Sequence, residues 1–281
     1  MSAGLDLDPR YVAARRVLLD ALASLAPHGN AVIVVGAQAV YLRTGRGEVA
    51  NAIAPFTTDG DLALDPALLG DEPELAQAMI DAGFRSSEPG IWNTTTRVAG
   101  QDIVVPVDLI VPEAASTGEG WRGARLGRHG NRAARRAVGL EAALVDHSPI
   151  TISALEPADA RVVTAEVAGA AALLVAKAHK INDRFTAGRT GRLSDKDAAD
   201  VYRIMQTVPP ADAVAALRRL LNDPLSAAVT EQALEYLRGL FGRRAGEGVA
   251  MAQRSLRLAV DEAQVATLSV AFTEQILVAR T

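Results

Sequence analysis

The spacing of apolar and polar positions predicts alternating helices and strands in the first part of the chain. An amphipathic helix is expected over 9–26, with Asp8 as its N-cap. The continuous apolar run AVIVVG at 31–36 predicts a buried strand that ends in a glycine turn. The same criteria predict further strands at 56–65, 91–98, 103–111, 149–155 and 161–164, and helices at 37–46 and 73–84.

The second part of the chain shows helical spacing almost throughout. The expected helices cover 166–184, 195–208, 210–222, 225–241 and 249–280, with a break inside the last. Strands followed by a run of helices are typical of an α+β architecture. We therefore predict an α+β core over 1–165 and a mainly helical domain over 166–281.

Composition excludes several classes of function. The net charge of −4 gives no overall basic field for nucleic acid, although a local basic patch remains compatible with it. The chain has no cysteine, which removes disulfides, thiolate nucleophiles and Cys-ligated zinc, and its four histidines lack metal-ligand spacing. Because we find neither a signal segment nor an apolar run of membrane-spanning length, we expect a cytoplasmic protein without a membrane partner.

An acidic pair stands out in the stretch TTDGDLAL at 57–64. In an extended strand Asp59 and Asp61 share one face at roughly 6.5–7 Å between Cα atoms. Like charges at this separation repel each other, and burial adds a desolvation cost, so a cation is expected between them. Asp108 is a lone acid in the apolar run VVPVDLIVP. If its strand lies beside the first, the three carboxylates could hold two Mg²⁺ ions, and the alternative is that all three are structural.

Two further features favour phosphate binding. Gly36 ends a predicted strand and opens a helix, so the backbone N–H groups of this turn can receive an anion. Of 29 basic residues 26 are arginine, and the three lysines, Lys177, Lys180 and Lys196, fall within one short window. Lys177, Lys180 and Arg184 share one helix face, where three cations are most useful with an anion in front of them. A solvated helix face is the alternative.

Together these motifs resemble the DNA polymerase β-type nucleotidyltransferase superfamily. The shared pattern is a strand, Gly36-Ala37 and a helix, then Thr58-Asp59-Gly60-Asp61-Leu62, then an apolar strand that carries Asp108. The segments LLVAKAHKINDR at 173–184 and SDKDAADVYRIM at 194–205 are similar to two helices of the AbiEii/MenT-like nucleotidyltransferases, often type IV toxins of toxin–antitoxin pairs. The resemblance covers residues 30–208. It implies a nucleotidyltransferase-type mixed sheet flanked by helices, with the helical half completing the active-site cleft.

The resemblance also implies an activity and a set of site residues. The expected reaction is Mg²⁺- or Mn²⁺-dependent transfer of a nucleoside monophosphate from an NTP to an acceptor hydroxyl, with RNA, and the tRNA 3′ end in particular, as the acceptor and an antitoxin protein as a further partner. Asp59, Asp61 and Asp108 are the expected metal ligands and catalytic residues, joined by Lys177, which would neutralise the triphosphate. The residues expected to bind the nucleotide are Gly36, Ala37, Lys177, Lys180, Arg184, Lys196 and Asp197.

Other interpretations stay open at this point. Ala37 stands where the family pattern has Gly or Ser, so the turn supplies no hydroxyl to a phosphate, and a degenerate, non-catalytic nucleotide-binding module is one alternative. Transfer to a small molecule or a protein is another. Ser194 to Asp197 also matches a capping box, which would make Asp195 and Asp197 helix-start acids, whereas Asp200 could orient a lysine through a salt bridge.

A Gly- and Arg-rich segment at 112–137 gives weaker signals. Its glycines in GEGWRG match a dinucleotide-binding pattern, but no convincing strand precedes them, so a loop is favoured. Trp121 could stack on a base. Its arginines could line a path for a polynucleotide backbone or form a solvated surface, and they are Arg122, Arg125, Arg128, Arg132, Arg135 and Arg136.

Overall fold

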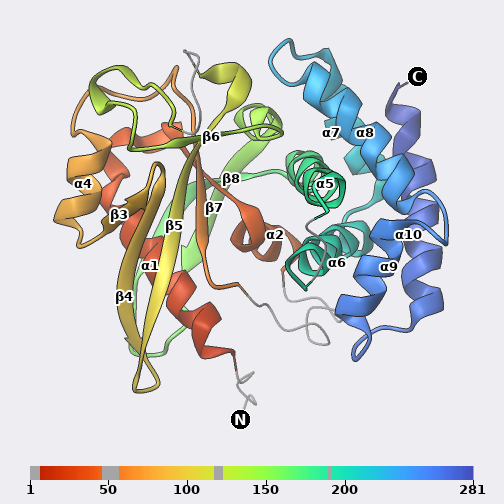
Figure 1. Cartoon of the computed structure of the whole chain (residues 1–281), viewed down its shortest axis with the longest axis horizontal. Helices are drawn as coiled ribbons and strands as arrows, with labels where there is room; N and C mark the ends of the chain where they lie inside the picture. Colours follow the sequence, from red (N-terminus) through yellow and green to blue (C-terminus); the bar gives the residue numbers. More distant parts are fainter. Residues whose placement is uncertain (1–6, 46–56, 117–122, 189–191, 281) are drawn as a thin grey trace.

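A mixed β-sheet organises the first half of the chain in the computed structural model, which describes residues 7–45, 57–116, 123–188 and 192–280 (Figure 1). Within these residues the sheet has eight strands in the order β3-β4-β5-β2-β1-β8-β7, with β6 paired to β5. The strands are β1 (Val32–Val35), β2 (Gly60–Leu64), β3 (Arg85–Glu88), β4 (Ile91–Val98), β5 (Gln101–Pro112), β6 (Arg135–Ala137), β7 (His147–Ser153) and β8 (Val162–Ala168).

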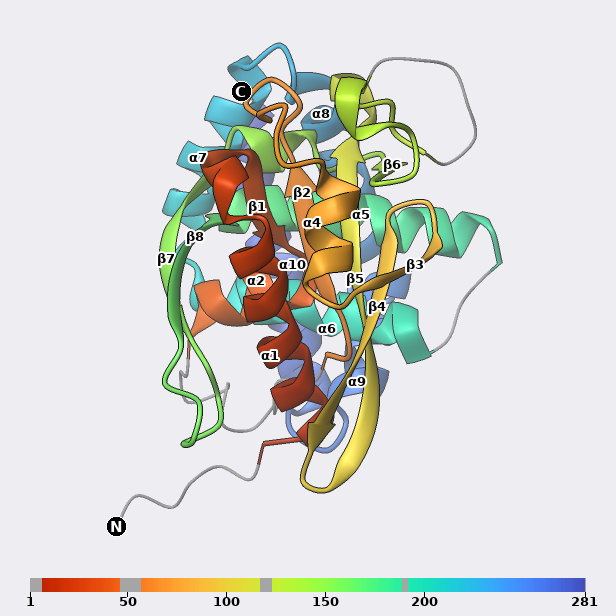
Figure 2. The same cartoon turned by 90° about the vertical axis from the view of Figure 1, so that its left-hand side faces the viewer.

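Helices cover both faces of this sheet. Figure 2 shows α1 (Pro9–Ser24) lying across one face, beside α4 (Leu75–Asp81), while α2 (Gly36–Thr44) lies on the other side. The Asp8 side chain accepts a hydrogen bond from the N–H of Arg10, as expected of an N-cap. The buried apolar residues of α1 pack on β2, β4 and β5, which explains its amphipathic spacing.

The second half of the described chain is helical, as predicted. Its helices are α5 (Ala170–Thr186), α6 (Arg192–Thr207), α7 (Pro210–Asn222), α8 (Ala227–Phe241), α9 (Glu247–Leu256) and α10 (Glu262–Ile276). Large buried side chains such as Tyr202, Phe241 and Phe272 fill the space between them. Helices α5 and α6 also pack against α2, so the two halves share one core. The α+β fold class is thereby confirmed.

The structure corrects details of the sequence prediction. Strand β3 was not predicted, because its residues RSSE are polar and exposed and carry no apolar signal. Position 165, the expected domain boundary, lies inside β8, since this strand pairs with β1 and β7 up to its end. Helix α6 begins at Arg192, so Ser194 lies inside the helix and is not its N-cap, whereas Asp195 lies in the first turn as a helix-start acid. Within the described residues, no helix has the length and apolar character needed to cross a membrane.

Candidate active site

The sheet register brings the two strand acids together. Strand β2 runs parallel to β5, and Asp61 lies directly opposite Asp108. On its other side β2 runs antiparallel to β1, which places Val35 opposite Asp61. Asp59 precedes the first residue of β2 by one position, so the strand predicted over 56–65 begins later than expected. The expectation that the strand of Asp108 lies beside that of Asp61 is confirmed.

The glycine turn that follows β1 packs directly on Asp61. Gly36 has a φ of +69°, and a Cβ atom added to it would lie 2.0 Å from Oδ2 of Asp61. Only glycine combines this backbone conformation with this approach. Helix α2 starts at Gly36, with Ala37 buried behind it, so the first turn of a helix stands beside the acid cluster. A helix N-terminus favours negative charge, which here includes the carboxylate of Asp61.

We expect Gly36→Ala to lower the free energy of unfolding by about 3 kcal/mol or more, because it adds backbone strain and displaces Asp61. Gly83→Ala is the matched control. Gly83 also has a positive φ, of +86°, but a Cβ there meets no atom within 4 Å. That control should cost only about 1–2 kcal/mol. Urea unfolding measures both, and equal losses would contradict a specific Gly36–Asp61 contact.

The three acids have different surroundings. The Thr57 hydroxyl donates a hydrogen bond to Asp59, and Arg135 donates two hydrogen bonds to Asp108. Among the described residues, no group donates a hydrogen bond to the side-chain carboxylate of Asp61. Burial, followed by repulsion from Asp59, raises the pKa of Asp61 from 3.8 to about 6. The protein around Asp61 therefore compensates its charge only in part, through Lys180 and Lys177.

The donor set at this position suits a hard divalent cation. Carboxylate oxygens are the preferred protein ligands of Mg²⁺ and Mn²⁺, and a cation beside Asp59 and Asp61 would remove the repulsion that raises the pKa of Asp61. The described residues include no group of three His, Asp or Glu side chains already arranged around one point. Asp108 is turned toward Arg135 instead. The fit to a cation thus rests on Asp59 and Asp61.

Lys177 lies in a buried ion-pair cluster on the helical half. Its side chain is 4% exposed, and Nζ donates to Asp197 at 2.6 Å and to Asp200 at 2.7 Å. Burial opposes the positive charge, but attraction to Asp197 and Asp200 outweighs it and raises the pKa of Lys177. Asp200 therefore orients a lysine, as the sequence suggested. Lys177 itself is enclosed between two carboxylates, which makes it a poor first contact for a triphosphate.

The other predicted cations surround Asp197 or face the acid cluster. Arg184 donates to Asp197 at 2.5 Å, and Lys180 lies 3.5 Å from it with 44% of its side chain exposed. Burial would raise the pKa of Asp197, but Lys177 and Lys180 hold it at about 2. Asp197 is thus an anchor for cations, and of these cations Lys180 is the most exposed.

Electrostatic contacts join the two halves at this site. Lys180 and Lys177 partly offset the repulsion that acts on Asp61. Burial lowers the pKa of Lys196, while attraction to Asp200 and Asp59 opposes that effect. All three lysines of the chain therefore interact electrostatically with carboxylates of the first half. The structure brings the predicted site residues into one region, namely Gly36, Ala37, Asp59, Asp61, Asp108, Lys177, Lys180, Arg184, Lys196 and Asp197.

No model of a known protein family matches the chain, and a comparison with curated proteins finds no match. The functional interpretation therefore depends on the geometry of the site and on the sequence motifs that it brings together.

The arginines of the segment 112–137 do not form one uniform basic surface. Arg135 bonds to Asp108, Arg136 pairs with Glu113 at 2.8 Å, and Arg128 pairs with Glu72 at 3.3 Å. Arg125 and Arg132 are exposed. GEGWRG, with Trp121 and Arg122, lies largely outside the described residues. The sequence did not reveal the individual role of Arg135. This role depends on the parallel pairing of the three-residue strand β6 with β5, and so short a strand has no recognisable hydrophobic pattern.

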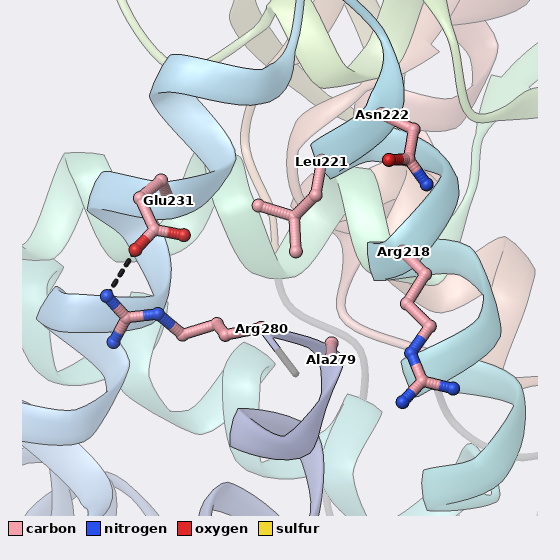
Figure 3. Close-up of a pocket in the computed structure, with 6 residues that line it drawn as sticks. All are labelled: Arg218, Leu221, Asn222, Glu231, Ala279 and Arg280. Atoms are coloured by element: carbon pink, nitrogen blue, oxygen red, sulfur yellow. Dashed lines mark hydrogen bonds and ion pairs between the residues drawn. The ribbon is translucent and has the colours of Figure 1, made fainter.

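A separate hollow lies at the far end of the helical half, between α7, α8 and the C-terminal turn Leu277–Arg280 (Figure 3). It has a volume of about 400 Å³, and one of its two lining arginines, Arg280, is paired with Glu231 and Glu235. None of the predicted site residues lines it. Its lining residues are Arg218, Leu221, Asn222, Glu231, Ala279 and Arg280.

Proposed function

We propose that the chain is a Mg²⁺-dependent nucleotidyltransferase that transfers a nucleoside monophosphate from an NTP to an acceptor hydroxyl. The observation that carries this proposal is the pairing of Asp61 with Asp108 across two parallel strands, beside the Gly36 turn. From the helical half, Lys180 attracts Asp61 electrostatically and Lys196 attracts Asp59. Phosphoryl transfer is catalysed by groups of this kind, namely a bound divalent cation, a helix N-terminus and nearby ammonium groups.

In the proposed reaction, the acceptor oxygen forms a bond to the α-phosphorus and the bond to the bridging oxygen of pyrophosphate breaks, while the hydroxyl proton is released. A divalent cation at Asp59 and Asp61 would lower the pKa of the attacking hydroxyl and stabilise the leaving pyrophosphate. Asp108 acts with these two acids to activate the hydroxyl. Lys180 replaces Lys177 as the preferred triphosphate contact, because its ammonium is exposed whereas that of Lys177 is enclosed.

RNA is the favoured acceptor, and the tRNA 3′ end in particular. The sequence resemblance to toxin nucleotidyltransferases supports this choice, as does the position of the exposed Arg125 and Arg132 in the segment whose end bonds to Asp108. In this proposal the chain acts as the toxin of a toxin–antitoxin pair, with an antitoxin protein as its partner.

Incubation with each α-labelled NTP, Mg²⁺ and total tRNA tests the activity. Label should enter RNA with the wild-type chain and fall by at least about 10³-fold in Asp59→Ala/Asp61→Ala. Asp102→Ala is the matched control, because Asp102 is an exposed acid at the tip of the β4–β5 hairpin.

Lys180→Met should raise KM for NTP more than it lowers kcat, since Lys180 is expected to bind the phosphates.

Two outcomes would redirect the proposal. Transfer to small hydroxyl acceptors, unaffected by Arg125→Glu/Arg132→Glu, would replace RNA with a small molecule, because charge reversal should abolish only the contact with a polynucleotide backbone. If calorimetry detects no binding of Mg²⁺–NTP, the chain is a degenerate member with a regulatory role, and the enzymatic proposal fails.

A further inference from the structure

Arg135 makes an oriented contact with one oxygen of Asp108. Its Nε lies 3.1 Å and its Nη2 lies 2.6 Å from the same atom, Oδ2. The two side chains are 31% and 19% exposed, so the pair is largely shielded from solvent. Charge-assisted hydrogen bonds of this kind are strong and directional. Arg135 therefore supplies a fixed positive charge at Oδ2 and leaves Oδ1 outside this contact.

The backbone around Arg135 is held on both sides. Strand β6 pairs with β5, where Arg135 lies opposite Ile110. The carbonyl of Arg132 accepts from the N–H of Gly90 at 2.9 Å, and that of Ala133 accepts from the buried Trp92 indole, also at 2.9 Å. A Cβ on Gly90 would lie 2.3 Å from the backbone nitrogen of Arg135, so this close packing requires glycine. The arginine is thus placed by the fold and not by a mobile surface loop.

We propose that Arg135 is a positioning residue that limits the acid cluster to one divalent cation when no nucleotide is bound. The inference rests on the proposed function. A two-metal arrangement would need Asp108 to attract a second cation. The guanidinium already satisfies Oδ2, and it repels another positive ion placed at the same carboxylate. The single cation then lies at Asp59 and Asp61, while Arg135 holds Asp108 through Oδ2.

Mn²⁺ binding to the full chain, followed by the electron paramagnetic resonance signal of the free ion, tests this inference without any measurement of activity. The wild-type chain should bind about one Mn²⁺, and Arg135→Gln about two. Arg136→Gln is the matched control, because Arg136 is the next residue on β6 and pairs with Glu113 instead. It should bind as the wild type does. Arg135→Lys, which keeps the charge, should also retain the wild-type stoichiometry.

A second variant keeps the inference falsifiable if Arg135→Gln does not fold. Asp108→Asn should bind one Mn²⁺ with an affinity within about threefold of the wild type, because the ion is assigned to Asp59 and Asp61. Two Mn²⁺ ions in the wild type, or unchanged stoichiometry in a folded Arg135→Gln, would each overturn the role of Arg135 while leaving the proposed metal site intact. Loss of binding in Asp108→Asn would overturn the assignment of the ion to Asp59 and Asp61, and with it the role of Arg135. No Mn²⁺ binding in any variant would overturn both proposals together.

Discussion

Asp61→Asn is expected to abolish nucleotide transfer and, at neutral pH, to make the metal-free chain more stable. The loss of activity should be at least about 10³-fold, because asparagine has no negative charge with which to hold the cation. The gain in stability should be about 1–3 kcal/mol, since burial and repulsion from Asp59 disfavour the ionised carboxylate of Asp61. Opposite effects on stability and activity are typical of a residue whose charge serves a ligand.

The raised pKa of Asp61 determines the pH at which Asp61→Asn should be more stable than the wild type. The pKa of Asp61 is raised in the folded chain from 3.8 to about 6. Below a pH of about 3.8 Asp61 is protonated in both the folded and the unfolded chain, so it does not lower the stability of the folded chain. As the pH rises through this interval the unfolded state loses its proton first, so the folded wild type loses stability. The advantage of Asp61→Asn should therefore be absent in acid and complete above a pH of about 6.

Thermal unfolding in EDTA across this pH range measures the effect, with Asp102→Asn as the control for an exposed acid. Added Mg²⁺ or Mn²⁺ should raise the unfolding temperature of the wild type at neutral pH and leave that of Asp61→Asn unchanged, because ligands stabilise only the state that binds them. A less stable Asp61→Asn at neutral pH, or equal stabilisation of both chains by Mg²⁺, would contradict the assignment of Asp61 to a cation seat.

Lys177→Met is expected to lower the free energy of unfolding by about 3–5 kcal/mol, because removal of one partner of a buried ion pair leaves uncompensated charge. Asp197 and Asp200 would lose their common ammonium while both remain buried. Lys180→Met is the matched control, since Lys180 is on the same helix but 44% exposed and 3.5 Å from Asp197. It should cost less than about 1 kcal/mol.

Two further measurements separate this ion-pair effect from a general packing defect. In Lys177→Met/Asp200→Asn part of the stability should return, because one of the two buried carboxylates that lost the ammonium group is removed. The pKa of Asp197 is lowered to about 2 in the wild type, so its contribution is present at neutral pH and is lost as the pH falls toward that value. The difference between wild type and Lys177→Met should shrink accordingly in acid. A difference that stays constant with pH would indicate lost packing alone.

Much of the local structure was determined by the sequence itself. The apolar run at 31–36, which ends in Gly36, became β1 and the start of α2, because a buried strand and a positive φ leave few other residue choices. Helical spacing located α7 and α8 to within a few residues in the same way. The lysine window also contains Lys177, which pairs with Asp197 and Asp200, since a buried charge requires a partner.

Only the tertiary structure determined which of these charged residues lie beside one another. The parallel register of β2 and β5 sets Asp61 against Asp108, and pairing between distant strands has no local sequence signal. The same holds for β6, which brings Arg135 onto Asp108 from a segment that looked like a uniform basic surface. Lys177 and Lys180 are three residues apart on one helix, yet packing against α6 encloses the first and leaves the second exposed. The sequence thus determines which charged residues the chain carries. The packing of its helices and strands determines which of them are paired within the protein and which stay accessible to a ligand.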